Sequence, residues 1–309
     1  MTDVLTFGEA MGALRAEGPV RLGGPMGLSV AGTEATVAIG LARLGHAARW
    51  IGVTGADEVG VLVRCTLRGE GVDTTGSRVD AGASTGLCFL ETRLAGTTRI
   101  GYHRAGSAGS RLHADDVLNG FADGQTRILH VTGITCALGP GPRRAVIEAV
   151  AMAKAMGVTV CLDVHHRPAL WSRADAAACL RPLLRSVDVL IASDDDLAVI
   201  AGDATPAELL RFVDQVVLRH GGAGEGTALT RLERRHQPAR VVSAVDPTGA
   251  EDAFVVGYLS GLIDGLGVAD RLYRAATVAG FGIATVGYWQ GLPTRAELPL
   301  LGDAYGRPL

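Results

Sequence analysis

The sequence lacks the features that mark membrane, secreted and nucleic-acid-binding proteins. No apolar run reaches the ~18 residues that a membrane-spanning helix needs, and the first residues, MTDVLTFGEAMG, lack the basic and apolar stretches of a secretory signal. No cluster of lysine and arginine stands out against a net charge of -3, so nucleic acid and anionic membranes are poor partners. We therefore expect a cytoplasmic protein with no nucleic-acid or membrane partner.

Cysteine is scarce and follows no metal-binding or disulfide pattern. The chain has 5 cysteines, an odd number, and none of them forms a C-x-x-C pair. They are Cys65, Cys88, Cys136, Cys161 and Cys179. This pattern argues against a zinc site or a disulfide framework and fits a reducing compartment.

Two common nucleotide-binding motifs are also missing. The G-x-G-x-x-G fingerprint of dinucleotide-binding folds should follow the first strand, but residues 7–12 read FGEAMG. The Walker A pattern G-x-x-x-x-G-K-[ST] does not occur in the chain. A nicotinamide-dependent dehydrogenase is therefore a minor alternative, and a P-loop kinase is disfavoured.

Short apolar segments alternate with helical stretches along most of the chain. The expected strands are residues 4–7, 48–53, 127–131, 158–163, 187–192 and 215–219. The expected helices are residues 34–44, 60–69, 143–156, 175–185, 250–262 and 272–284. This alternation is typical of βαβ units and predicts one α/β domain over residues 1–309, with a mostly parallel sheet between helices.

Two segments depart from this rhythm. Residues 11–30 and about 84–105 alternate polar and apolar residues, which predicts antiparallel strands in a small separate sheet. Such a sheet could act as a lid over a cleft. Because exposed apolar strands often pair with a second copy, we also expect a homodimer through the lid.

The segment DPTGAEDAF, residues 246–254, carries the strongest chemical pattern. We expect a strand, a Pro-Thr-Gly turn and then a helix from about Ala250, whose free N–H groups would bind an anion. Asp252 would lie in the first turn and could take a proton from a substrate hydroxyl. The alternative is that Asp252 only caps the helix and offsets its dipole.

This segment resembles the D-x-x-G-A-G-D-A-F signature of ribokinase-like carbohydrate kinases of the phosphofructokinase-B type. Further segments resemble that family in the family's order: residues 31–45 (AGTEATVAIGLARLG), 162–171 (LDVHHRPALW), 216–224 (VVLRHGGAG) and 287–298 (GYWQGLPTRAEL). The resemblance implies a three-layer fold with a small lid, and transfer of a phosphoryl group from ATP, with Mg²⁺, to a small sugar. It also implies Asp252 as the base, beside an anion-binding turn of Gly249, Ala250 and Glu251.

Within the family, residues 101–110 and 130–135 look most like 2-keto-3-deoxygluconate kinases. The positions that this resemblance places around the sugar are Gly32, Thr36, Tyr102, Arg104, Ile134 and Arg167. A sugar acid carries a carboxylate, to which Arg104 and Arg167 could donate charge-assisted hydrogen bonds. The alternative is that both are surface arginines in ion pairs worth ~0–1 kcal/mol.

The resemblance also places the nucleotide. Its contacts would be Ser193, Arg219, Gly221, Gly224 and Gly249. Asp194 and Asp196, in the run SDDD, stand where the family acts on Mg²⁺ through water. The alternatives are a solvated helix start for the acidic run and a plain turn for the glycines.

Glu251 is the most consequential departure, because it stands at the second glycine of the signature. Two unit charges ~4 Å apart at an effective dielectric of ~20 repel by ~4 kcal/mol, which corresponds to roughly a thousandfold in rate. A neighbouring carboxylate should also raise the pKa of Asp252. The carboxylate could instead turn to solvent or hold a metal. A degenerate member that binds a sugar or nucleotide without turnover therefore stays an alternative.

Other departures affect the sugar site. His165 and His166 replace an asparagine and an aromatic residue, and Thr36 replaces an asparagine. Adjacent histidines suggest a metal, but neighbours on a strand point to opposite faces, so we favour a structural role. Cys88 replaces an aromatic residue of the lid, and Arg219 replaces a lysine. A relative of 2-keto-3-deoxygluconate, a neutral sugar or a nucleoside remains open as substrate.

Overall fold

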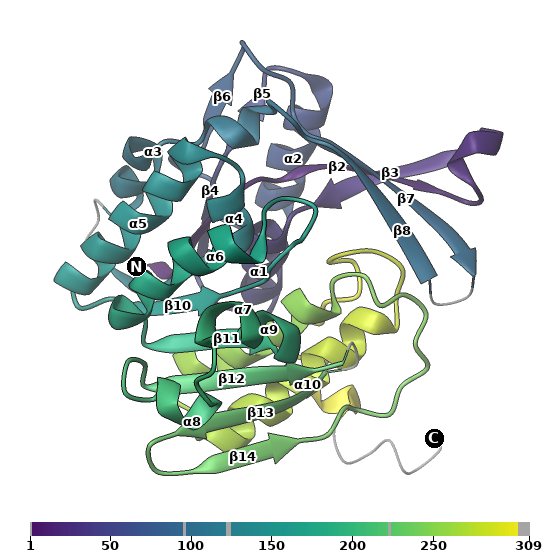
Figure 1. Cartoon of the computed structure of the whole chain (residues 1–309). Coiled ribbons are helices and arrows are strands. Elements are labelled where there is room, and N and C mark those ends of the chain that lie inside the picture. Colours follow the sequence, from purple (N-terminus) through teal and green to yellow (C-terminus); the bar gives the residue numbers. More distant parts are fainter. Residues whose placement is uncertain (1, 95–96, 122–124, 222–223, 302–309) are drawn as a thin grey trace.

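A central sheet of eight strands lies between two layers of helices in the computed structural model, which describes residues 2–94, 97–121, 125–221 and 224–301 (Figure 1). In spatial order the strands are β14 (Arg234–Gln237), β13 (Glu225–Thr230), β12 (Gln215–His220), β11 (Val189–Ser193), β10 (Thr159–Asp163), β9 (Thr126–Thr132), β1 (Thr2–Phe7) and β4 (Ala48–Ile51). Strands β12 to β4 pair in parallel, and β13 and β14 are antiparallel. The expected mostly parallel sheet is confirmed.

Helices cover both faces of this sheet and complete a three-layer fold. One layer holds α3 (Ala114–Leu118), α4 (Gly133–Ala137), α5 (Pro140–Ala155), α6 (Arg173–Leu180), α7 (Asp194–Ala201) and α8 (Pro206–Leu209). The other holds α1 (Thr33–Arg43), α2 (Glu58–Gly69), α9 (Ala250–Ile263) and α10 (Val268–Ile283). None of the helices in the described ranges is long and apolar enough to cross a membrane.

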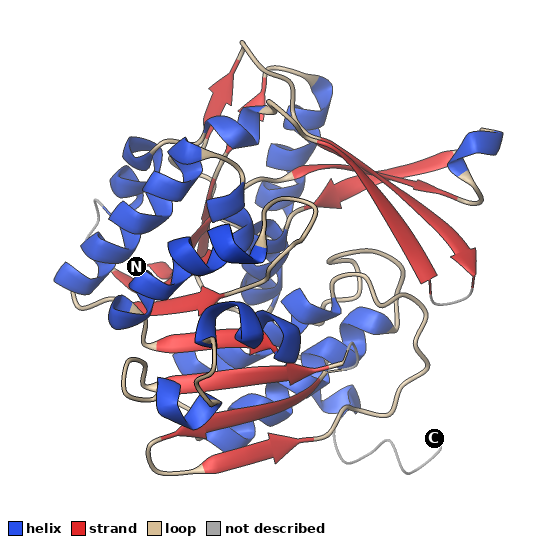
Figure 2. Cartoon of the chain, in the orientation of Figure 1, coloured by secondary structure: helices blue, strands red, loops and turns tan. Residues whose placement is uncertain are grey.

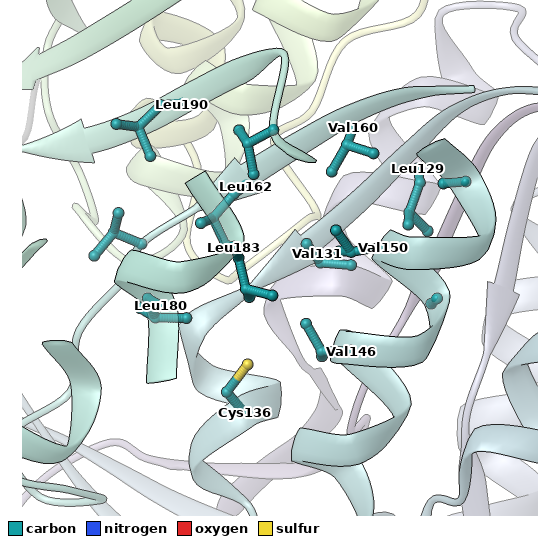
Figure 3. Close-up of a cluster of buried hydrophobic side chains, with 14 of the residues drawn as sticks. Leu129, Val131, Cys136, Val146, Val150, Val160, Leu162, Leu180, Leu183 and Leu190 are labelled. Carbon is teal, nitrogen blue, oxygen red and sulfur yellow. The ribbon is translucent and has the colours of Figure 1, made fainter. Parts of the chain in front are cut away.

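Successive residues of a strand point into two separate hydrophobic cores, one on each face of the central sheet. Leu129 and Val131 of β9 pack with Val146 and Val150 of α5 on one face (Figure 3). Ile128 of the same strand packs on the other face, in the cluster that includes α1 and α9. Full burial of a valine or leucine side chain contributes ~1.5–3 kcal/mol, so the same strands hold both helical layers in place.

A second sheet projects from one side of the molecule (Figure 2). Its strands, in spatial order, are β3 (Met26–Ala31), β2 (Met11–Ala16), β7 (Leu87–Leu94) and β8 (Thr97–His103). These strands fall in the two segments expected to form the small sheet, except that β3 ends one residue beyond residue 30. The pairs β2–β3 and β7–β8 are antiparallel, as expected, whereas β2 and β7 are parallel. The parallel pair arises because the chain passes through α1, β4 and α2 before it returns as β7.

Several local expectations were wrong, among them the single strand expected over residues 48–53, which ends at Ile51 and is followed by a separate strand in another sheet. The helix expected to end at residue 185 stops at Leu180 and continues as a 3-10 helix over Arg181–Ser186, where Pro182 has no N–H to donate. Strands β13 and β14 were not expected at the sheet edge. No strand precedes Asp246, since residues 238–249 form no regular element, although the N–H groups of Val245 and Asp246 both donate to Ile283. In addition, β5 (Val53–Gly55) and β6 (Arg78–Asp80) form a separate two-stranded sheet.

Candidate active site

A cavity of about 530 Å³ lies between the small sheet and the start of α9. Parallel strands of an α/β sheet present their carboxyl ends to the ligand, and β1, β9 and β10 are followed here by Glu9, Ile134 and His165, which all line the cavity. The lining contains five of the six expected sugar-site residues, Gly32, Tyr102, Arg104, Ile134 and Arg167, and all of residues 247–252. The fold therefore brings most of the predicted site together.

Helix α9 begins at this cavity without a side-chain cap. Its N-cap, Gly249, has φ of +80°, and a Cβ there would lie 2.3 Å from the carbonyl oxygen of Tyr288, so only glycine fits. The first N–H groups of a helix have no partner within it, and Ala250, Glu251 and Asp252 line the cavity. This helix start can therefore hold an anion.

Asp252 has the environment of a general base. Its side chain is buried, it makes no capping hydrogen bond, and Oδ1 has no hydrogen-bond partner among the described residues. Burial raises the pKa of Asp252 to about 6, with the charge of His165 lowering it and that of Glu251 raising it. A carboxylate with this pKa is ionised at neutral pH and is still basic enough to take a proton.

The carboxylate of Glu251 is paired with two neighbouring side chains. Its Oε2 lies 3.1 Å from Nε2 of His165 and 3.2 Å from Nη2 of Arg167. Burial opposes its ionisation, but the hydrogen bond and charge of His165, with the charges of Arg219 and Arg167, hold the pKa of Glu251 well below its ordinary range. The sequence raised the hypothesis that Glu251 places an unpaired negative charge beside Asp252. In the structure, that charge is paired with His165 and Arg167.

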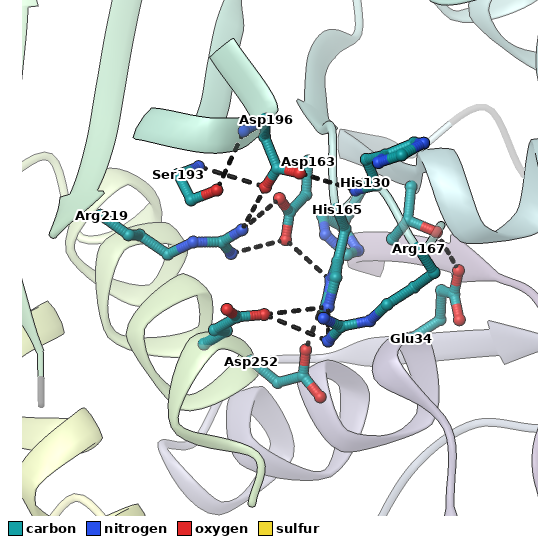
Figure 4. Close-up of polar contacts among 12 residues, drawn as sticks. Glu34, His130, Asp163, His165, Arg167, Ser193, Asp196, Arg219 and Asp252 are labelled. Carbon is teal, nitrogen blue, oxygen red and sulfur yellow. Dashed lines mark hydrogen bonds and ion pairs between the residues drawn. The ribbon is translucent and has the colours of Figure 1, made fainter. Parts of the chain in front are cut away.

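His165 lies at the centre of these contacts (Figure 4). It is 2% exposed, and Nδ1 lies 3.5 Å from Asp163 and 3.8 Å from Asp252. Burial and the charge of Arg167 lower its pKa, but the contacts with the carboxylates of Asp163 and Glu251 outweigh them and raise the pKa of His165 to about 9.

The neighbouring His166 points elsewhere. Its N–H donates to Asp196 at 2.8 Å, and Nε2 lies 3.2 Å from the carbonyl oxygen of Trp171. The two rings therefore diverge as expected, although the reason given was wrong, because β10 ends at Asp163 and His165 has φ of +38°. In the described parts of the chain, no three histidine, cysteine or acidic side chains are placed to hold a metal.

Each predicted sugar-site arginine already faces a protein carboxylate. Arg104, whose side chain is 11% exposed, forms an ion pair with Glu9, which also accepts a hydrogen bond from Ser107. Arg167 is 45% exposed and pairs with Glu251. The exposure of Arg104 excludes the surface alternative for that residue, and Arg167 keeps an accessible face toward the cavity.

Thr36 is not part of the cavity lining. It is 1% exposed in α1, and Oγ1 has no partner among the described residues, whereas Thr33 and Glu34 line the cavity one turn earlier. Glu34 accepts hydrogen bonds from Thr132 and Thr135 at 2.5 and 2.6 Å. Burial raises the pKa of Glu34 despite these bonds.

Three of the five predicted nucleotide residues, Arg219, Gly221 and Gly224, lie together next to the start of α9, whereas Gly249 lines the larger cavity. A small recess there is lined by Gly221, Gly224, Ala250, Glu251 and Arg219 among others. The two glycines have φ of +64° and +87°, which suits a turn that glycine adopts readily. Arg219 is 3% exposed and donates to both oxygens of Asp163 at 2.8 and 2.9 Å, so its guanidinium is committed to a protein carboxylate.

The acidic run at the start of α7 is divided between two environments. Ser193 is the N-cap and accepts from Asp196 N–H, while the Asp196 carboxylate accepts from the N–H groups of Ser193 and His166. Asp194 is 68% exposed and lies 3.0 Å from Nδ1 of His220. Of the two predicted residues, Asp194 and Asp196, the first therefore keeps a carboxylate that could act on a metal through water.

Sequence reasoning missed Glu9, Glu34 and Tyr288 and gave His165 no role in the site. Glu9 could have been found, because it follows the end of β1 at the edge where ligands bind. Glu34 and Tyr288 were not singled out, although both lie in segments that resemble the family, residues 31–45 and 287–298.

The chain matches the model of the pfkB family carbohydrate kinases over residues 1–295. It is 36% identical over 277 residues to 2-dehydro-3-deoxygluconokinase of Thermoproteus tenax, covering 85% of this chain and 83% of that protein. It is 29% identical over 307 residues to the enzyme of that name from Bacillus subtilis strain 168, covering 96% and 94%.

Solved structures agree with this match. A PfkB protein from Polaromonas sp. JS666 superposes with a TM-score of 0.85 at 30% identity, covering 96% of this chain and 99% of that chain. A protein described as ribokinase II from E. coli, in complex with ATP and Mg²⁺, has a TM-score of 0.88 at 23% identity, with 97% and 99% covered. At 23% identity, the similarity to the E. coli structure shows a common fold alone.

Proposed function

The chain belongs to the pfkB family of carbohydrate kinases, and from this premise we propose that it transfers the γ-phosphoryl group of ATP to a hydroxyl of 2-keto-3-deoxygluconate or a closely related sugar acid. The observation that carries the proposal is Asp252, a buried carboxylate with a free oxygen at the uncapped start of α9. A base and an anion-binding helix start are the two parts that phosphoryl transfer to a hydroxyl requires.

In the proposed reaction, Asp252 accepts the hydroxyl proton while the hydroxyl oxygen forms a bond to phosphorus and the bond to the ADP oxygen breaks. The N–H groups of the first turn of α9 hold the negative charge that develops on the phosphoryl oxygens. When bound, ATP with Mg²⁺ supplies the phosphoryl group and offsets charge on the phosphates. Gly221 and Gly224 would accommodate the nucleotide, and Asp194 would act on Mg²⁺ through water.

The sugar-acid assignment draws on the two cavity arginines and on the names of the relatives. Arg167 has the more accessible guanidinium, and we assign it the substrate carboxylate. Arg104 lies deeper, against Glu9, where it would contact hydroxyl or keto oxygens. The degenerate alternative gains no support, because Glu251 is paired with His165 and Arg167 instead of standing free beside Asp252.

Three expectations from the sequence remain proposals: a single domain over residues 1–309, a cytoplasmic location and a homodimer through the small sheet. Leu22, Leu28 and Ile100 of that sheet and its hairpin are exposed apolar residues consistent with the last. Sedimentation analysis would test the dimer.

The test of function is ATP turnover with 2-keto-3-deoxygluconate by the unaltered protein and by Asp252→Asn. We expect turnover in the first and a loss of at least ~100-fold in the second. A thermal-shift measurement should show that the variant still binds the sugar acid and a non-hydrolysable ATP analogue, since ligand near 100 times its Kd adds ~2.7 kcal/mol. Asp115→Asn, at an exposed position of α3, is the matched control. Full turnover by Asp252→Asn would remove Asp252 from the mechanism.

A further inference from the structure

A group of charged residues surrounds the catalytic carboxylate, and we call it the His165 cluster: Asp163, His165, Arg167, Glu251 and Asp252. Figure 4 shows His165 between Asp163, Asp252 and Arg167. The imidazole ring bridges two sides, with Nδ1 toward Asp163 and Asp252 and Nε2 toward Glu251 and Arg167. Because carboxylates lie on both sides of this buried ring, we infer that it carries a positive charge and does more than fill space in the core.

The backbone is arranged to place this ring. His165 has φ of +38°, and it is the one non-glycine residue with positive φ in the described ranges of the chain. A left-handed conformation is unfavourable for residues with a side chain and persists where surrounding contacts enforce it. Its occurrence directly after β10, at the edge of the cavity, indicates that the position of the ring matters to the site.

Two facing atoms of the cluster lack a hydrogen bond in the described part of the chain, although Nδ1 of His165 also lies 3.5 Å from the carboxylate of Asp163. Nδ1 of His165 and Oδ1 of Asp252 are 3.8 Å apart, both are buried, and neither has a hydrogen-bond partner within the described residues. Buried polar atoms are nearly always paired. A small approach of the two side chains would form a charge-assisted hydrogen bond between the ring and the base.

The proton on His165 decides which partner Nε2 has. This nitrogen lies within hydrogen-bond distance of both Glu251 and Arg167, and it cannot donate to one and accept from the other at once. Carboxylates on both sides favour the protonated ring, which donates to Glu251, while Arg167 donates to the same carboxylate. The negative charges of Glu251 and Asp252 are then offset by the positive charges of His165 and Arg167. The negative charge of Asp163 is offset by Arg219.

We propose that His165 and Glu251 form a matched pair of positioning residues, in which the protonated ring offsets Glu251 and supports the ionised form of Asp252. The inference rests on the proposed function only in taking Asp252 as the base. Glu251 stands where the family signature has glycine and His165 where it has asparagine, so each residue compensates for the presence of the other. Neither is required to touch the substrate.

Among the other charged groups near the ring, Arg219 also contributes to this balance, because its charge lowers the pKa of Glu251. His130 is fully buried, burial lowers its pKa to about 4, and it is therefore neutral. Burial raises the pKa of Glu34, which favours its neutral form. Arg219 is committed to Asp163. The groups that set the charge at Asp252 are therefore His165, Glu251, Asp163 and Arg167, which also affect its pKa.

The first arm of the test is a double-mutant cycle on turnover of 2-keto-3-deoxygluconate. We expect His165→Asn and Glu251→Gly each to lower kcat by about tenfold or more, and the double variant to recover to within about threefold of the unaltered protein. Asparagine tolerates the left-handed backbone at residue 165. Losses that simply multiply in the double variant would overturn the pairing.

The second arm is the pH profile of kcat, which a purely structural role would not move. Asp252 acts when deprotonated, so kcat rises with pH through a limb near 6. His165 lowers the pKa of Asp252 and Glu251 raises it, so His165→Asn should move the limb to higher pH and Glu251→Gln to lower pH, each by about one unit. His166→Asn, whose ring points away, is the control and should leave the limb in place. Shifts in the same direction for both variants would overturn the proposal.

A third arm needs no turnover and separates this inference from the proposed function. The imidazole resonances of His165 in the unaltered protein should titrate near pH 9, and in Glu251→Gln they should titrate at least about one unit lower. If no sugar acid is phosphorylated but this shift appears, the pair stands and the substrate assignment fails. If turnover occurs but His165 titrates near its ordinary value in both proteins, the pair is refuted and the kinase assignment stands.

Discussion

At the scale of single residues, two carboxylates that are neighbours in the chain have opposite pKa shifts because their surroundings differ. Asp252 is buried with a free oxygen, and its pKa rises to about 6. Glu251 turns toward His165 and Arg167, and its pKa falls well below the ordinary range. A pair of titratable groups pushed in opposite directions is typical of catalytic sites, where one group exchanges protons and the other keeps its charge.

Arg167 leads to a prediction about substrate choice. Arg167→Ala should weaken binding of a sugar acid by about tenfold to hundredfold, because it removes a hydrogen bond between charged groups, and should affect the neutral sugar analogue far less. Kd values for both ligands, measured by calorimetry on both proteins, check this. Arg231→Ala, at an exposed position, is the control. Equal losses for the acid and the neutral analogue would mean that Arg167 does not contact the carboxylate.

At the scale of elements, an ion pair connects the small sheet to the turn before α9. Nη2 of Arg15, in β2, lies 2.7 Å from Oδ2 of Asp246, which is 4% exposed. The same carboxylate accepts hydrogen bonds from the N–H and hydroxyl of Thr248 and from the N–H of Gly287. Asp246 therefore holds the turn before α9 through hydrogen bonds and contacts the small sheet through Arg15. The same side chain thus connects the sheet to the start of the helix.

This link predicts that Arg15→Ala raises KM for the sugar by about threefold to tenfold and lowers kcat by a smaller factor. The variant loosens the small sheet over the cavity, while Asp246 keeps its bonds to the turn and Asp252 is untouched. Steady-state kinetics on Arg15→Ala, with the exposed Arg21→Ala of the same hairpin as control, measure the effect. An unchanged KM would show that the ion pair does not hold the sheet in its working position.

Elements with a clear apolar pattern could be predicted from the sequence. Elements that form only because a neighbouring strand or helix packs against them could not. Strand β10 and helix α9 were found within one residue at each end. Strand β14 was missed because its sequence, RRHQ, is entirely polar and shows no apolar alternation, although its backbone pairs with β13. The strand expected before Asp246 does not form, because the apolar residues there receive no partner strand.

The same distinction holds for the site. Asp252 could be located because its motif is local, with a turn glycine three residues before the carboxylate. The contacts between His165 and Glu251 and between Glu9 and Arg104 join residues far apart in the chain, and no periodicity encodes them. These long-range pairs decide the charges in the cavity, so the electrostatics of the site needed the fold.

At the scale of the whole molecule, the buried pair of Asp163 and Arg219 joins the middle of the central sheet. Asp163 ends β10, and Arg219 comes from β12, with β11 between them. Both side chains are almost completely buried, and the guanidinium contacts both carboxylate oxygens. Burial opposes the charge on Asp163, but the charge of Arg219, with the His165 contact, holds its pKa well below the ordinary range. An ion pair therefore connects the strands near their carboxyl ends, at the edge that borders the cavity.

This pair predicts an acid-sensitive contribution to folding. Because the pKa of Asp163 is lower in the folded than in the unfolded protein, its stabilisation is complete above the unfolded value of ~3.9 and is lost as pH falls below it. Asp163→Asn should cost ~3–5 kcal/mol at pH 7, since it leaves Arg219 buried without a countercharge. Urea unfolding between pH 3 and pH 7 measures both effects, with the exposed Asp214→Asn as control. The variant should lose less stability on acidification than the unaltered protein. Equal losses in the two proteins would show that another carboxylate governs acid unfolding.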